Sequence, residues 1–194
     1  MLELPLFPLD LVLLPYESLP LHIFEPRYKK MVKNSIEQGK PFGIILKQGD
    51  EVFRKGCSVE VSRVFKEYQN GEYDILVKGT APFDVISTKK DGDTIIGKVE
   101  YLSLEAEAHE TGFKELQDTF LKVLLRFGIN TDLELHMDKQ ISYEFLQGIQ
   151  LPVAVKKDII DISKESERLL FINGIFTNIL KTDIQSDNRL KPEA

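Results

Sequence analysis

The sequence has one cysteine, no tryptophan and three histidines among its 194 residues. Because Cys57 is alone, no disulfide can form within the chain, which is typical of proteins from a reducing compartment. The histidines, His22, His109 and His136, lie far apart, and none has the short spacing of a zinc-ligand pair. We therefore expect no metal site. Cys57 has no neighbouring cationic motif and is expected to be a small buried side chain rather than a nucleophile.

Long apolar runs are also missing. The first 26 residues are rich in leucine, but five of the nine prolines fall among them, and Glu3 and Asp10 interrupt the pattern. The longest apolar run there, residues 11–14, is far shorter than the ~20 residues that span a bilayer. A signal peptide would start with basic residues, which this stretch lacks. These features predict a cytoplasmic protein.

Basic residues are outnumbered by acidic ones, 25 to 31, and the net charge is −6. This balance disfavours nucleic acid as the main partner, because duplex binding requires lysine and arginine to neutralise phosphates. The acidity lies mainly in residues 103–194, whereas residues 1–102 are nearly neutral. A local basic cluster is the exception, and its simplest interpretation is a solvated helix face. Its members are Arg27, Lys29, Lys30 and Lys33.

Catalytic motifs are absent too, apart from one near match to a phosphate-binding loop. Residues 92–98 fit the G-x-x-x-x-G-K pattern, but Val99 stands where serine or threonine must reach Mg²⁺. A phosphate-binding loop leads from a strand into a helix, whereas residues 94–102 have the pattern of a strand. The scattered carboxylates and histidines define no acid–base pair or nucleophile. We expect a protein without enzymatic activity and without a cofactor.

The residues that are present predict an α+β fold. Pro26 suits the first turn of a helix that ends at Gly39. Short strands follow, and Asn70-Gly71 and Asp91-Gly92 are strong hairpin-turn signals. Beyond them, apolar residues recur at steps of three and four between Phe113 and Phe127. Later helical stretches are expected around residues 142–149 and 155–162. Ser163 can cap a last helix whose buried face runs from Leu169 to Leu180. The predicted organisation is a β-rich lobe at 1–102, a connection at 103–110, a helical lobe at 111–184 and a frayed tail at 185–194.

Several segments resemble the N-terminal domain family of Lon proteases. The most specific is Leu21–Tyr28, with the sequence LHIFEPRY, and the likeness covers residues 3 to about 181. Pro82 and Lys156-Lys157-Asp158 depart from the family pattern. The resemblance implies a PUA-like β pseudo-barrel followed by a C-terminal helical bundle. In full-length Lon proteases this domain precedes an ATPase module and a protease module, for which this sequence has no room.

The resemblance also implies a non-catalytic module that binds polypeptides. The expected partners are unfolded or partly folded chains with exposed apolar segments. The protein would act as an adaptor or quality-control factor, with a protease or chaperone as a further partner. Candidate contact residues are Phe24, Arg27, Tyr28 and Met31, in an apolar groove where the helix after Pro26 meets the β lobe. The same residues can instead build the fold, since apolar residues at helical spacing usually face the core. The alternative function is a PUA-like module that binds RNA or a small molecule. The oligomeric state stays open.

Overall fold

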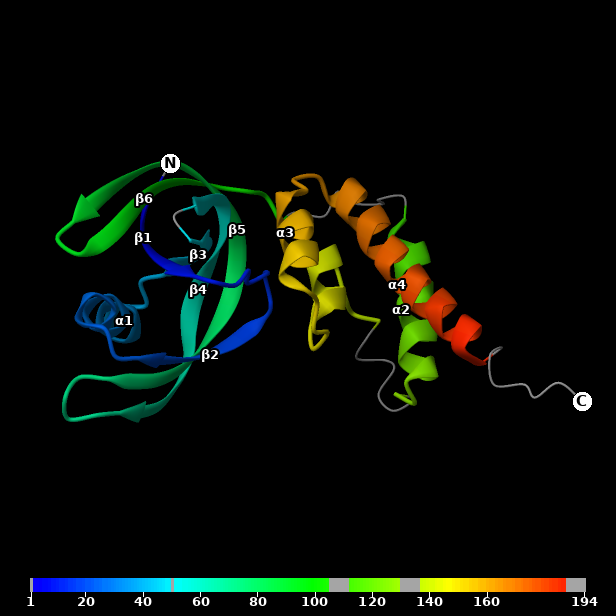
Figure 1. Cartoon of the computed structure of the whole chain (residues 1–194), viewed down its shortest axis with the longest axis horizontal. Coiled ribbons are helices and arrows are strands. Elements are labelled where there is room, and N and C mark those ends of the chain that lie inside the picture. The colour runs from blue at the N-terminus through cyan, green and yellow to red at the C-terminus, as the bar shows by residue number, and fades with distance from the viewer. Residues whose placement is uncertain (1, 50, 105–111, 130–136, 188–194) are drawn as a thin grey trace, which may run out of the picture. The chain divides into compact units, whose positions relative to one another are not determined.

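The computed structural model describes residues 2–49, 51–104, 112–129 and 137–187. The chain forms two compact units, drawn in Figure 1. Residues 1–104 and 146–161 form the barrel unit, and residues 105–145 and 162–194 form the helical unit. Among the described helices, none combines the length and apolar character needed to cross a membrane.

The barrel unit is built on a six-stranded mixed sheet. Its strands are β1 (Leu2–Leu9), β2 (Ser18–Ile23), β3 (Phe42–Gln48), β4 (Glu51–Glu67), β5 (Tyr73–Asp91) and β6 (Thr94–Tyr101). The order is β2-β5-β4-β3-β1-β6, and β6 also pairs with β5. Five strands therefore close into a ring, and β2 is attached to its outside through β5. β1 and β3 run parallel, while the other pairs are antiparallel.

The barrel core is filled by alternating residues of its strands. One cluster of buried side chains comprises Leu4, Leu6, Ile45, Phe83, Val85 and Val99. Glycine makes room for the largest of them, because a Cβ added to Gly43 would lie 2.6 Å from the Phe83 ring. A Cβ on Gly56 would lie 2.5 Å from the Ile44 carbonyl oxygen. These glycines let β3 and β4 pass close to a buried aromatic ring, as strand glycines often do.

Both predicted hairpin turns are confirmed. Gly71 takes the left-handed φ of 78° between β4 and β5, and Gly92 takes a φ of 57° between β5 and β6. The strand between these turns is longer than the short strands predicted for this region. β5 is one strand of 19 residues. Register shifts along its pairings with β4 and β6 bend it, so that one strand serves β2, β4 and β6.

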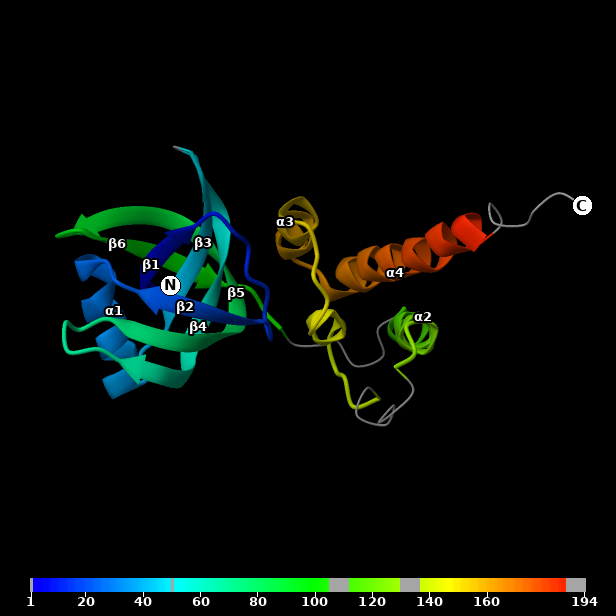
Figure 2. The same ribbon diagram turned by 60° about the horizontal axis from the view of Figure 1, so that its bottom comes forward.

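Helix α1 (Pro26–Gln38) packs its apolar side against the barrel. The helix ends where Gly39 adopts a left-handed φ of 64° and donates its N–H to the Ser35 carbonyl oxygen. The Tyr28 ring stacks on the Phe7 ring of β1, with centroids 4.0 Å apart. Figures 1 and 2 show α1 between the tips of the β4–β5 and β5–β6 hairpins.

The predicted boundary between the lobes was wrong for residues 146–161, which belong to the barrel unit. This segment contains helix α3 (Val153–Asp161). The Lys156 ammonium lies 2.7 Å from the Glu17 carboxylate, and the Lys157 ammonium lies 4.8 Å from the Phe53 ring centroid. One ion pair to the β1–β2 connection and one cation–π contact to β4 thus attach α3 to the barrel unit. Sequence order alone had placed it with the other helices.

The helical unit contains α2 (Phe113–Arg126), most of the 3-10 turn η2 (Ser142–Leu146) and α4 (Glu165–Asp187). α2 packs on α4. Phe120 lies at the centre of their contact, with its ring 5.3 Å from Phe145 and 5.6 Å from Phe176 between centroids. The α+β prediction is confirmed. The prediction of a frayed tail at 185–194 is wrong for residues 185–187, which belong to helix α4. Residues 188–194 of that tail and residues 105–110 of the predicted connection lie outside the described residues.

Candidate functional site

The candidate site lies on the outer face of the sheet formed by β2, β5 and the second half of β4. Residues directly opposite one another in a sheet share a face. The pairing register therefore places three cross-strand rows on this face: His22–Asp74–Lys66, Pro20–Leu76–Arg63 and Ser18–Lys78–Glu60. The opposite face carries the buried Tyr73, Ile75 and Val77. The outer face is thus accessible, while the inner face belongs to the core.

An aromatic platform stands at one end of this outer face, and it consists of His22, Phe24 and Tyr68. Phe24 is 58% exposed and stacks on the His22 ring, with centroids 5.9 Å apart. Tyr68 meets the same imidazole edge-on at 6.0 Å. The Lys66 ammonium lies 4.3 Å from the Tyr68 ring centroid. The platform therefore combines an exposed apolar ring with two rings that have polar tips.

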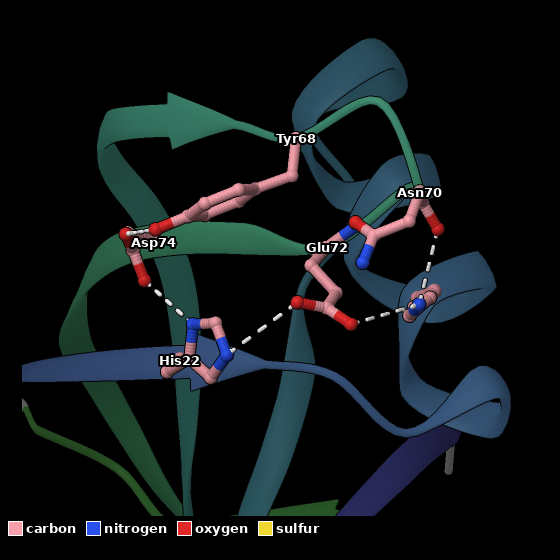
Figure 3. A network of polar contacts seen from close by, with 6 residues as sticks. His22, Tyr68, Asn70, Glu72 and Asp74 are labelled. Atoms are coloured by element: carbon pink, nitrogen blue, oxygen red, sulfur yellow. Dashed lines mark hydrogen bonds and ion pairs between the residues drawn. The ribbon is translucent and has the colours of Figure 1, made fainter.

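A polar network holds the platform in place (Figure 3). The His22 Nδ1 lies 2.7 Å from one oxygen of Asp74, and the Tyr68 hydroxyl donates to the other oxygen at 2.7 Å. The His22 Nε2 lies 3.7 Å from the Glu72 carboxylate. Glu72 in turn lies 3.6 Å from the Lys29 ammonium, which donates to the Asn70 carbonyl oxygen. Strand β2, helix α1 and the β4–β5 turn are thereby tied together.

The network also shifts the pKa values of Asp74 and Tyr68. The hydrogen bonds from the Tyr68 hydroxyl and from His22 hold the pKa of the Asp74 carboxyl below its ordinary value. The same hydrogen bond to Asp74, assisted by desolvation, raises the pKa of the Tyr68 hydroxyl. Near neutral pH, Asp74 is consequently an anion that accepts from a neutral tyrosine. This charge state favours the fixed ring geometry.

The arrangement suits binding better than catalysis. Asp74 orients His22 as a carboxylate orients a catalytic histidine, but the free side of the imidazole faces Glu72 rather than a nucleophile. Across the residues that the structure describes, no group of three or more metal-ligating side chains could hold an ion. Cys57 is fully buried, and burial raises the pKa of its thiol, so the thiolate needed for reactivity is disfavoured.

The near match to a phosphate-binding loop is a hairpin in the structure. Gly92 lies in the β5–β6 turn, and Gly97 and Lys98 lie within β6, where they pair with β5 and β1. A phosphate-binding loop needs successive backbone N–H groups that converge on the anion at the start of a helix. Gly97 and Lys98 instead lie in a strand that pairs on both sides.

The predicted apolar groove on α1 was wrong at two of its four residues. Tyr28 is 5% exposed and Met31 is 6% exposed, because the helix lays this side on the barrel. Phe24 and Arg27 are exposed. Phe24 joins the platform, whereas Arg27 lies 2.6 Å from the Glu25 carboxylate and borders a hollow toward the β5–β6 hairpin. The structure therefore separates the four predicted contact residues.

The sequence alone did not indicate three of the site residues, Tyr68, Glu72 and Asp74. The Asn70-Gly71 turn signal marked the hairpin that carries them, but the partner of that hairpin was not evident. The contact between His22 and Asp74 spans 52 positions of sequence. Only the register of β2 on β5 brings the two together.

The closed β barrel carries an exposed, oriented aromatic cluster beside its added edge strand, an arrangement that suits a binding domain. Comparison with known proteins identifies which kind. Residues 3–185 match the family described as the ATP-dependent protease La (LON) substrate-binding domain. The chain belongs to this family, whose domain is a non-catalytic substrate-binding module.

Two solved structures share the fold. One is a Lon N-terminal domain protein from Xanthomonas campestris, with a TM-score of 0.65 and 22% identity over 87% of this chain and 95% of that one. The other is the N-terminal domain of a Mycobacterium avium complex Lon protease, with a TM-score of 0.72 and 15% identity over 90% and 98% of the two chains. These likenesses confirm the fold that the LHIFEPRY segment implied.

Proposed function

We propose that this protein binds unfolded polypeptides through the aromatic platform and thereby acts as an adaptor or quality-control factor. The observation that carries the proposal is the exposed Phe24 ring, which is stacked on an imidazole that is itself held by Asp74. A single exposed apolar residue is ordinary on a protein surface. A ring that a polar network holds in place is less ordinary, and its fixed position leaves it ready to accept an apolar side chain.

The fixed geometry favours affinity for physical reasons. Ordering a flexible side chain at an interface costs about 0.5–1.5 kcal/mol, and a ring already held by neighbours avoids part of this cost. Aromatic residues also dominate the binding energy of many interfaces. A client that inserts a leucine or phenylalanine beside Phe24 would bury apolar area against Phe24 and against the hydrocarbon edges of His22 and Tyr68.

The open edge of β2 contributes to the proposal in a limited way. β2 pairs only with β5, so its other edge along Ser18–Ile23 has no strand partner in the described sheet. A client could add itself there as a further strand, as peptides do in several recognition domains. Pro20 lies in the middle of this edge and has no N–H to donate. Recognition by side chains at the platform is therefore favoured over strand addition.

RNA binding is the competing function, and one observation favours it. Aromatic rings on a sheet face beside a cation, here Tyr68 and Lys66, are typical of proteins that stack single-stranded bases. The carboxylates of Glu72 and Asp74 lie at the same rings and would repel phosphates. We accordingly favour polypeptide over RNA, and the experiment below compares them directly.

The test uses fluorescence anisotropy with a labelled neutral peptide that carries two leucines and one phenylalanine. Phe24→Ser should weaken binding about tenfold or more, which corresponds to ~1.4 kcal/mol or more for loss of an aromatic anchor. Phe127→Ser is the matched control, because Phe127 is 62% exposed but lies in the helical unit. It should leave the affinity unchanged.

Two outcomes would contradict the proposal. If both variants bind the peptide as the parent protein does, the platform is not the site. If an oligo-uridylate of ten nucleotides binds more tightly than the peptide and Phe24→Ser abolishes that binding, the platform serves RNA. We further propose that the protein has no ATPase activity. ATP turnover that disappears in Lys98→Ala would contradict this.

A further inference from the structure

The basic charge of α1 is placed where it does not stabilise the helix. Positive side chains are unfavourable near the N-terminus of a helix, where the dipole is positive, and acidic residues are preferred there. The first turns of α1 carry Arg27, Lys29, Lys30 and Lys33, and the first turn has no acidic residue. The chain as a whole has a net charge of −6. The cluster therefore runs against both the local preference and the overall balance, as binding sites often do.

All three lysines of this cluster border a hollow of about 630 Å³ between α1 and the β4–β5 hairpin. The residues that line it are Lys29, Lys30, Lys33, Glu67, Tyr68, Gln69, Gly71 and Tyr73. Lysines thus form the helix side, and the hairpin forms the other. The Tyr73 hydroxyl donates to the Glu67 carboxylate, which engages the one acidic residue of this lining. The lining residues themselves therefore carry more positive than negative charge.

Two of the lysines have carboxylate partners beside the hollow, since Lys29 lies 3.6 Å from Glu72 and Lys33 lies 3.7 Å from Glu37. The Lys33–Glu37 pair is exposed and contributes little, so a client carboxylate can compete with Glu37 for Lys33.

The hollow is continuous with the aromatic platform. Tyr68 belongs to both, because it lines the hollow and also contacts His22 edge-on. The Lys29 ammonium is connected to His22 through the Glu72 carboxylate, at 3.6 Å and 3.7 Å. A single extended segment a few residues long could therefore contact the platform with one side chain and the lysines with a neighbouring one.

We propose that this hollow selects clients with acidic residues next to the apolar residue that the platform holds. The inference rests on the proposed function and specifies which polypeptides are preferred. Lysine ammonium groups are compact point charges that suit single carboxylates. A nucleic acid carries a charge on every nucleotide and would have to pass Glu67 and Glu72, whereas a peptide can place one or two carboxylates at Lys30 and Lys33 and neutral residues elsewhere.

The experiment compares three labelled peptides with the same apolar core, flanked by two serines, two glutamates or two lysines. The whole protein should bind the glutamate peptide about threefold to tenfold more tightly than the serine peptide, and the lysine peptide more weakly. This preference should shrink between 0.02 M and 0.5 M salt, because ions screen exposed charges. Lys30→Gln/Lys33→Gln should bind the serine peptide normally and should show no preference for glutamate.

The control variant is Lys89→Gln/Lys90→Gln, which removes two positive charges from β5 outside the hollow. It should keep the preference. The inference is overturned if the parent protein shows no preference, or if the Lys30/Lys33 variant retains it. If the parent protein binds an oligo-uridylate more tightly than the glutamate peptide, and the Lys30/Lys33 variant does not, the hollow binds nucleic acid instead. Failure of the proposed function would give a different result, because the parent protein itself would then not bind the serine peptide.

Discussion

The two units of this protein use polar networks in opposite ways. In the helical unit, the Arg168 guanidinium is 2% exposed and hydrogen-bonds to Glu165, to the Ser142 hydroxyl and to the Ile162 carbonyl oxygen. In the barrel unit, the network of His22, Asp74 and Tyr68 lies at the surface. A buried network cannot reach a ligand, and breaking it costs stability. An exposed network costs less to break but can position groups for binding.

The largest expected effect comes from breaking the buried network. Arg168→Ala would leave the largely buried Glu165 carboxylate without its cationic partner, and the N–H and hydroxyl of Ser142 would still donate to it. We expect a loss of about 3–5 kcal/mol in the free energy of unfolding of the helical unit, as for other buried ion pairs that lose one member. Urea denaturation followed by circular dichroism measures it. Lys164→Ala, which removes an exposed pair with Glu167, is the control and should leave the unfolding midpoint unchanged.

A smaller loss is expected from the ion pair that attaches α3 to the barrel unit. The side chains of Lys156 and Glu17 are 18% and 11% exposed, and Glu17 also accepts the Leu14 N–H. Lys156→Ala should lower the free energy of unfolding by about 2 kcal/mol, since hydrogen bonds to charged groups contribute ~1.5–3 kcal/mol. Hydrogen exchange should show the loss in residues 10–19 and 153–161. Protection lost only in α2 and α4 would contradict the placement of α3 in the barrel unit.

The smallest expected effect is a pH dependence of the exposed network. The pKa of Asp74 is lowered in the folded protein, so its contribution to stability is present above the unfolded pKa and is lost as pH falls through the folded pKa. The parent protein should therefore lose more of its melting temperature between pH 7 and pH 3 than Asp74→Asn loses. Glu3→Gln, at an exposed carboxylate elsewhere in the barrel unit, is the control. Equal losses in the parent and Asp74→Asn would show that the Tyr68 and His22 contacts do not stabilise the fold.

The same contrast explains which features were predictable. Turn and helix signals depend on residues that are adjacent in sequence. Gly39, Asn70-Gly71 and Asp91-Gly92 therefore marked real boundaries, because each glycine adopts a left-handed backbone, which favours glycine wherever it occurs. The mismatch at Val99 was likewise evident without a structure. The fold class and the family followed from the spacing and from the LHIFEPRY segment.

Other features could be determined only from the tertiary structure, because they depend on which helices and strands pack against each other. Helical spacing identified an apolar side of α1, but the stacking of Tyr28 on the Phe7 ring decided that this side is buried. Nothing local distinguishes Phe24, which remains exposed, from Tyr28, four positions later. The pairing of β2 with β5 brought His22, Asp74 and Tyr68 together. The salt bridge from Lys156 to Glu17 attached α3 to the connection between β1 and β2, 139 positions away in the sequence. Such long-range contacts leave no periodic mark on either segment, so only the folded chain specifies them.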